Sequence, residues 1–123
     1  MSVKWVKRAL VESPYCIGLC QKESHFKKEL KRIKVPPEMW PKWIRKGNAT
    51  VHFFEKGDSN DKFCLVCIEK GGKRYQTYGL LIHEAVHVWQ RIRKALNEKR
   101  PSKEFEAYSI QMIAQCLIAA YKR

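Results

Sequence analysis

The residues with the clearest chemical potential lie in one short stretch, His83-Glu84-Ala85-Val86-His87. On a helix with about 3.6 residues per turn, His83 and His87 stand one turn apart on the same face. Two imidazoles in this arrangement can converge on one metal ion, and Glu84 beside them lies within reach of a metal-bound water. The pattern therefore predicts a metal site, with Zn²⁺ as the expected cofactor.

The residues around this motif favour an amphipathic helix. Apolar side chains gather on the side away from the histidines, so that side can pack into a core. We predict that the helix runs over residues 79–97 and that residues 74–78 lead into it. The apolar residues are Leu81, Ala85, Val88, Trp89 and Ile92.

The last predicted helix offers a third ligand, which a catalytic zinc usually has besides its water. Ser102 is its natural N-cap, and the helix continues to the C-terminus. Glu104 begins a narrow polar stripe on an otherwise apolar helix, and a buried polar stripe needs partners. Glu104 is therefore the preferred ligand, and Glu106, on the opposite side of the helix, is the alternative. The helix dipole favours an acidic residue at either position, because both lie in the first turn. The stripe consists of Glu104, Tyr108, Gln111 and Gln115.

The rest of the chain predicts an α+β fold in one domain, residues 1–123. The active-site helix and the C-terminal ligand-bearing helix are expected to pack, with other helices, against a small antiparallel sheet of about three strands. Two of the strands form a hairpin around a turn at residues 57–61. The expected helices cover residues 1–12, 22–34, 79–97 and 103–123, and the expected strands cover residues 15–20, 49–56 and 62–70.

The net charge of +13 indicates attraction to an acidic partner, either nucleic acid or an acidic protein. Basic residues also serve simply to keep a small domain soluble. Trp40 and Trp43 lie among cations, a mixture that stacks bases in some proteins but more often caps a core. No apolar run is long enough for a membrane span and no signal-like segment is present, so we expect a cytoplasmic protein with no membrane partner.

Five cysteines are present, an odd number that favours thiols in a reducing compartment. The spacing of Cys16, Cys20, Cys64 and Cys67 would allow a second, structural zinc site. However, residues 63–68 read as a buried strand, in which residues three apart point to opposite faces. Buried thiols are therefore the favoured interpretation.

His83-Glu84-x-x-His87 followed by Glu104-x-x-Ala107 resembles the zinc-peptidase pattern of the gluzincins, in which a glutamate on a following helix is the third ligand. The strings HEAVHVWQ and EFEAYSIQ, within residues 78–115, are similar to those of very small phage-encoded metallopeptidases. The resemblance implies a zinc peptidase with a protein or peptide substrate, located in the host cytoplasm if phage-encoded. One position departs from it: several gluzincins have an aspartate where this chain has Tyr108.

The reaction that this resemblance implies is hydrolysis of a peptide bond by metal-activated water. Glu84 is expected to act as the general base and to pass the proton to the leaving amine. Tyr108 is the first candidate for a second electrophile that stabilises the oxyanion, ahead of His52 and Tyr78. A free edge of the hairpin, at residues 50–55, is expected to pair with an extended substrate.

An alternative function follows from the size and charge of the chain. Its 123 residues leave little room for the second subdomain that usually walls a gluzincin cleft. The chain would then bind zinc without cleaving peptides and act as a basic binding module for nucleic acid or a host protein. Zinc content, peptide cleavage and the salt dependence of DNA binding distinguish these functions.

Overall fold

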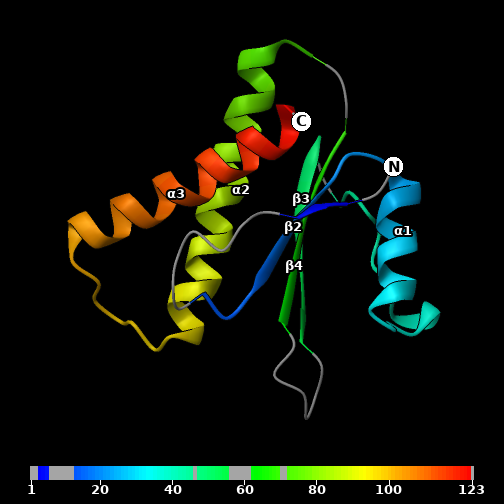
Figure 1. Cartoon of the computed structure of the whole chain (residues 1–123), viewed down its shortest axis with the longest axis horizontal. Coiled ribbons are helices and arrows are strands. Elements are labelled where there is room, and N and C mark those ends of the chain that lie inside the picture. Colours follow the sequence, from blue (N-terminus) through cyan, green and yellow to red (C-terminus); the bar gives the residue numbers. More distant parts are fainter. Residues whose placement is uncertain (1–2, 6–12, 46, 56–61, 70–71, 123) are drawn as a thin grey trace.

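The computed structural model describes residues 3–5, 13–45, 47–55, 62–69 and 72–122 and has the predicted α+β fold (Figure 1). One helix, α1, covers one side of the sheet, and α2 and α3 lie on the other. In chain order the elements are β1 (Lys4–Trp5), β2 (Cys16–Cys20), α1 (Glu23–Arg32), the short 3₁₀ helix η1 (Pro37–Met39), β3 (Ala49–Glu55), β4 (Lys62–Ile68), α2 (Arg74–Ala95) and α3 (Lys103–Lys122).

The sheet has four strands in the order β1-β2-β4-β3. β3 and β4 form the predicted antiparallel hairpin, with Phe53 opposite Cys64. β2 lies parallel to β4, with Ile17 opposite Cys64, and β1 is antiparallel to β2. The expectation of an antiparallel sheet of about three strands is therefore wrong in number and in direction. A parallel pair needs a long crossover, which the segment through α1 and β3 supplies here.

β1 replaces part of the helix expected over residues 1–12, of which residues 1–2 and 6–12 lie outside the described residues. Lys4 and Trp5 pair with Leu19 and Gly18 of β2. A Cβ atom at Gly18 would lie 2.6 Å from Val3 Cγ1 and 3.1 Å from the Trp5 ring. Because Gly18 has no side chain, the N-terminal residues can lie directly on β2.

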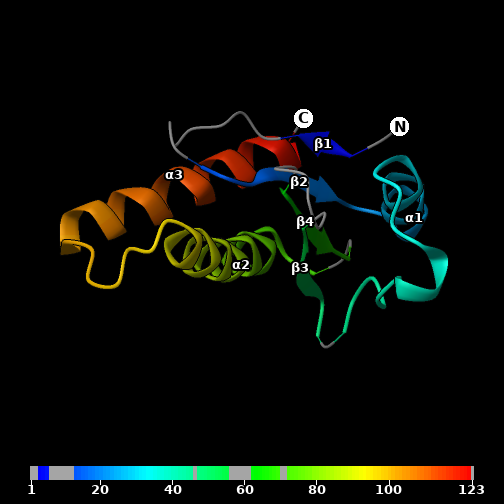
Figure 2. The ribbon, with the colours of Figure 1, turned by 90° about the horizontal axis from the view of Figure 1, so that it is seen from below.

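Each face of the sheet carries its own hydrophobic cluster, because side chains alternate along a strand. On one face α2 contacts β3 and β4 while α3 contacts β1 and β2, so each helix covers one half of the sheet (Figure 2). On the other face α1 buries Phe26 and Leu30 against Leu65 and Cys67. The predicted core side of the histidine helix is confirmed, since all its apolar residues are buried: Leu81, Ala85, Val88, Trp89 and Ile92.

The cysteines are free thiols, and most are buried as predicted. Cys64 belongs to the cluster under α2 and α3, whereas Cys67 belongs to the cluster under α1, which confirms that they point to opposite faces. Cys20 lies opposite Cys67 in the β2–β4 pair and is also buried. Burial raises the pKa of Cys64 and of Cys67, so both thiols stay protonated at neutral pH.

α2 begins at Arg74 rather than at the predicted Gly79, because a cap forms before it. The backbone N–H of Lys73 donates to Gln76 Oε1 at 2.8 Å. Gly72 precedes this cap with a φ of 78°, and a Cβ there would lie 2.9 Å from the same Gln76 oxygen. The longer helix places His83 well inside its hydrogen-bonded body, where the backbone is rigid.

The connection from α2 to α3 is held by side chains at both ends. Arg93 Nη1 donates to the carbonyl oxygens of Glu98 at 3.0 Å and Lys99 at 2.9 Å. The backbone N–H of Phe105 donates to Ser102 Oγ at 3.2 Å, which confirms Ser102 as the N-cap. The start of α3 is therefore fixed relative to the end of α2.

His52 is a buried polar residue of β3 on the α1 side of the sheet, with 1% of its surface exposed. Its ring lies 5.0 Å from the ring of Phe26. Nε2 lies 2.9 Å from the carbonyl oxygen of Trp43, and Nδ1 lies 3.3 Å from Arg45 Nη2. A neutral ring that donates from Nε2 and accepts at Nδ1 satisfies both contacts. Burial is the main cause that lowers the pKa of His52.

We therefore expect the protein to lose stability as the pH falls below 6.5, the ordinary pKa of histidine. In that range the unfolded chain takes up a proton while folded His52, with its lower pKa, stays neutral. The loss continues down to the folded pKa of His52. Urea unfolding at a series of pH values measures this slope, and His52→Gln, which keeps a donor and an acceptor, should flatten it. Equal slopes in the two proteins would show that His52 does not titrate as described.

Candidate functional site

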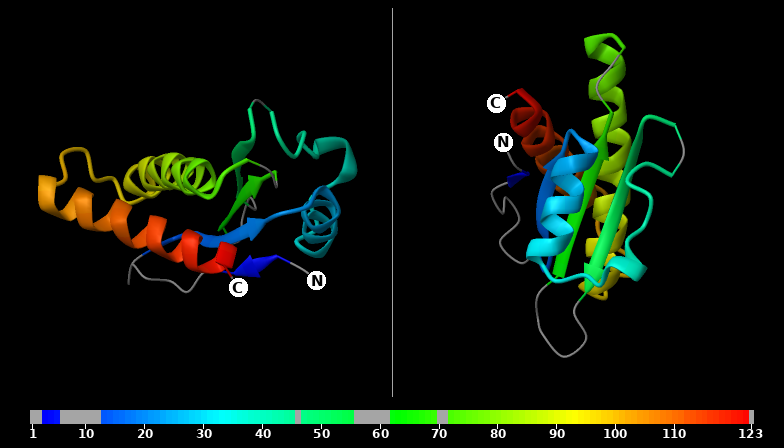
Figure 3. Two further views of the ribbon diagram at one scale, coloured as in Figure 1. Left: turned by 90° about the horizontal axis from the view of Figure 1, so that it is seen from above. Right: turned by 90° about the vertical axis from the view of Figure 1, so that its right-hand side faces the viewer.

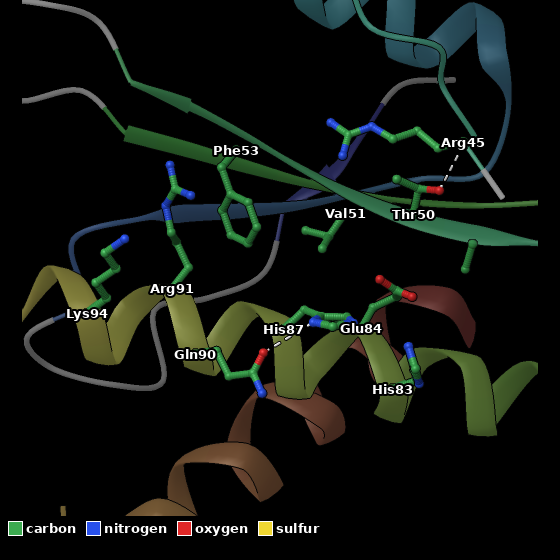
Figure 4. Close-up of a pocket in the computed structure, with 11 residues that line it drawn as sticks. Arg45, Thr50, Val51, Phe53, His83, Glu84, His87, Gln90, Arg91 and Lys94 are labelled. Atoms are coloured by element: carbon green, nitrogen blue, oxygen red, sulfur yellow. Dashed lines mark hydrogen bonds between the residues drawn. The ribbon is translucent and has the colours of Figure 1, made fainter. Parts of the chain in front are cut away.

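α2 presents His83, Glu84 and His87 along one side of the helix (Figure 4). The two imidazole centroids are 4.9 Å apart, with the rings inclined by 74°. His87 Nδ1 lies 3.2 Å from Gln90 Oε1. When Nδ1 carries the proton and donates to this oxygen, Nε2 keeps its lone pair for a metal. The structure thus brings together the three residues that the sequence motif predicted.

These residues face a pocket of about 700 Å³ between α2 and β3 (Figure 4). β3 is the outer strand of the sheet, so one side of the pocket is a sheet edge. The pocket has room for several residues of an extended chain beside the histidines. It is lined by Arg45, Ala49, Thr50, Val51, Phe53, His83, Glu84, His87, Gln90, Arg91 and Lys94.

Glu84 differs from the two histidines in its burial. Both imidazoles are exposed, whereas only 5% of the Glu84 surface is exposed. Burial raises the pKa of Glu84, and the nearby His83 and His87 lower it to a smaller extent. A carboxylate whose pKa is raised towards neutrality accepts a proton more readily than one in water.

Arg91 and Lys94 continue the same side of α2 beyond His87, and neither belongs to the site predicted from the sequence. Arg91 Nε donates to the Tyr15 hydroxyl at 3.0 Å, and its guanidinium carbon lies 4.8 Å from the centre of the Phe53 ring. The Tyr15 hydroxyl in turn donates to Glu55 Oε1. Positions four and seven residues after His87 share its helix face, so the spacing alone could have identified both cations.

Glu104 and Tyr108 do not join the histidines in this structure. Both are exposed on α3, Tyr108 to 62% of its surface, and neither lines the pocket. The polar stripe that begins at Glu104 faces solvent instead of a buried site. α3 lies on the side of α2 away from β3 (Figure 3). It packs against its neighbours through Ser109, Ile113, Ala114, Leu117 and Ala120.

Glu106, the alternative ligand, faces α2 but bonds to a different residue. The indole Nε1 of buried Trp89 donates to Glu106 Oε2 at 3.0 Å. Trp89 follows His87 by two residues and therefore leaves α2 on the opposite side from it. Glu106 thus has a structural partner within the core.

The other oxyanion candidates also lie apart from the pocket. His52 is buried among the aromatic rings on the α1 side of the sheet. Tyr78 packs edge-on against Tyr121 of α3, with ring centroids 6.5 Å apart. Neither side chain lines the pocket, so the structure does not bring them to Glu84.

The side chains present supply two of the three protein ligands that a catalytic zinc usually has. His83 and His87 supply two nitrogen donors on an open surface. Among the described residues, no group of three or more His, Cys, Asp and Glu side chains is close enough to hold one ion. Further coordination positions would therefore be open to water, substrate or a residue that moves.

Comparisons with models of protein families, with curated proteins and with solved structures find no match to this chain. The resemblance to gluzincins therefore rests on the motif residues alone. Within the described part of the chain, no helix combines the length and apolar character needed to cross a membrane.

Zinc stoichiometry separates the possible ligands. We expect His83→Ala and His87→Ala to lose bound zinc, because each removes one of two donors on the same helix face. Glu104→Ala and Glu106→Ala should keep the wild-type amount. Metal analysis by mass spectrometry after dialysis measures this. Loss of zinc from Glu104→Ala alone would mean that α3 turns towards α2 when metal binds.

The two glutamates of α3 should also differ in their effect on stability. Glu106→Ala leaves the buried indole N–H of Trp89 without an acceptor, so we expect a loss of about 1–3 kcal/mol in the free energy of unfolding. Glu104→Ala is the matched control: it removes the same charge from the same helix turn at an exposed position, with an effect within about 0.5 kcal/mol. Urea unfolding measures both, and equal losses would contradict the Trp89–Glu106 bond.

Proposed function

We propose that this protein is a zinc-dependent peptidase that cleaves an extended peptide lying between α2 and the edge of β3. One observation carries the proposal: the nearly buried carboxylate of Glu84 lies beside two exposed imidazoles, and all three face a pocket bordered by a sheet edge. A carboxylate in this position is unfavourable for stability, since burial opposes its charge. Such a cost is typical of a residue retained for chemistry.

His83 and His87 are the residues that would hold the metal. When bound there, zinc supplies Lewis-acid chemistry, which activates water and polarises a carbonyl group. The hydrogen bond between His87 and Gln90 fixes the orientation of one imidazole. The position of both histidines on a rigid helix, away from its ends, keeps their separation constant.

Glu84 is the general base in this proposal. Its raised pKa makes it an effective acceptor for the proton of the attacking water, and the same carboxylic acid then protonates the leaving amine. Both transfers need only a small movement, because peptide and water occupy the same pocket. The low exposure of Glu84 limits competition from bulk solvent.

The edge of β3 would position the substrate. β3 pairs with β4 along one edge and has its other edge free, and its Thr50, Val51 and Phe53 line the pocket. An extended peptide can add to such an edge through backbone hydrogen bonds, which hold it largely independently of its sequence. Val51 lies beside the histidines in Figure 4, so it would contact the residues next to the bond that is cleaved.

Glu84→Gln tests this assignment. We expect cleavage of a casein or peptide-library substrate to fall by roughly 10²–10⁴-fold, because the amide cannot take up the water proton. Zinc content should not change. Glu98→Gln, an exposed position between α2 and α3, is the matched control and should retain activity. Full cleavage by Glu84→Gln would disprove the role of Glu84 as base.

The same variant gives a stability readout that does not depend on activity. The folded pKa of Glu84 is raised above its ordinary value of 4.5, so its ionisation opposes folding at higher pH. Metal-free Glu84→Gln should therefore melt at a higher temperature than wild type at neutral pH. This gain should disappear below pH 4.5, where Glu84 is protonated in both states.

A further inference from the structure

The pocket between α2 and β3 is cationic at one end. Arg91 and Lys94 line it one and two turns beyond His87. Among the described residues that line the pocket, Glu84 is the one carboxylate, and it lies beside the histidines rather than at this end. A substrate that extends past His87 therefore meets positive charge.

Arg91 is held in place before any substrate arrives. Its Nε donates to the Tyr15 hydroxyl at 3.0 Å, and Phe53 lies 4.8 Å below its guanidinium. These contacts use one of its five N–H groups and one face of its plane. The paired η nitrogens remain suited to a carboxylate, which matches their planar fork.

Glu55 is the competing carboxylate at this end. Its Oε1 lies 3.8 Å from Arg91 Nη2, and the two side chains are 46% and 41% exposed. An ion pair this long and this exposed contributes little. Glu55 is held mainly by the Tyr15 hydroxyl, which donates to it. Lys62 also lies near this carboxylate, so three cations, Arg91, Lys94 and Lys62, face one carboxylate, and two positive charges are left in excess.

Arg45, the third cation of the pocket, is directed elsewhere. Its Nη2 lies 3.3 Å from Nδ1 of His52, which is buried on the α1 side of the sheet. Figure 4 shows its side chain on the far side of β3 from His83 and His87. The cationic end of the pocket is therefore the one formed by Arg91 and Lys94.

The distances along α2 give the position of the charge on a substrate. With about 1.5 Å per helical residue, Arg91 and Lys94 lie ~6 Å and ~10 Å beyond His87 along the axis. An extended peptide advances about 3.3 Å per residue, so these distances correspond to two and three residues. We propose that the substrate is a peptide with an acidic side chain two or three residues from the cleaved bond, bound by Arg91 and Lys94. This inference rests on the proposed peptidase function.

Peptides that differ only at this position test the proposal, with Glu, Gln or Lys placed two or three residues to either side of one scissile bond. We expect kcat/KM to be highest for Glu on one side. Lys94→Glu should reduce that preference by roughly two- to fivefold, which corresponds to the loss of one surface ion pair. Glu55→Gln should increase it, because the competing charge is removed.

Lys31→Glu is the matched control. Lys31 is an exposed residue in the last turn of α1, as Lys94 is in the last turn of α2, so both substitutions change the net charge and the helix dipole interaction equally. Lys31 lies on the other side of the sheet and should leave the peptide preference unchanged. An equal effect of both variants would mean that overall charge, and not the pocket, selects acidic peptides, and would overturn the proposal.

Binding measurements separate this inference from the peptidase function. Fluorescence anisotropy with the Glu, Gln and Lys peptides and Glu84→Gln protein reports selectivity without cleavage. If no peptide is cleaved but the Glu peptide binds best and Lys94→Glu abolishes this, the recognition holds and the catalytic proposal fails. Cleavage with no preference for Glu would overturn the recognition alone. If a single-stranded oligonucleotide binds through Lys94 and the Glu peptide does not bind, the proposed recognition of an acidic peptide is wrong and nucleic acid is the ligand of this end of the pocket.

Discussion

The packing of α2 on the sheet is the interaction on which the rest of the structure depends. Leu81, Ala85 and Val88 are completely buried in the hydrophobic cluster that α2 forms with the sheet, and the larger two, Leu81 and Val88, each contribute about 1.5–3 kcal/mol. A rotation of the helix by one residue would move these groups out of the core and the histidines into it. The hydrophobic contact therefore fixes the direction of His83 and His87, and it places Glu84 at the border between core and pocket.

Much of this arrangement could be predicted from local patterns. The hairpin, α1, the buried side of the histidine helix and the Ser102 cap all depend on residues close together in the sequence. The parallel pairing of β2 with β4 could not be predicted in this way, because it joins distant segments. The early start of α2 was missed for a different reason: the Gln76 side chain caps the helix in place of a typical capping residue.

The histidine motif of the candidate site could be predicted from the sequence, but the third ligand and the role of the two cations could not, for a physical reason. A polar stripe on a helix has the same sequence pattern whether it faces a buried site or bulk water. The stripe from Glu104 faces solvent, while Glu106 turns inward to Trp89. The helix period that identified His83 and His87 also identifies Arg91 and Lys94, but cations on an exposed helix usually need no partner. Only the structure shows that Arg91 and Lys94 line the same pocket as the histidines.

The bond between Arg91 and Tyr15 joins residues 76 positions apart. Tyr15 directly precedes β2, which cannot complete its parallel pair until β4 has been synthesised. During translation the first half of the chain therefore lacks its sheet partner, and long-range pairing of this kind slows folding. The pocket is also among the last features to form, since it needs α2 to reach Arg91. The order of synthesis thus delays the assembly of the site until nearly three quarters of the chain exists.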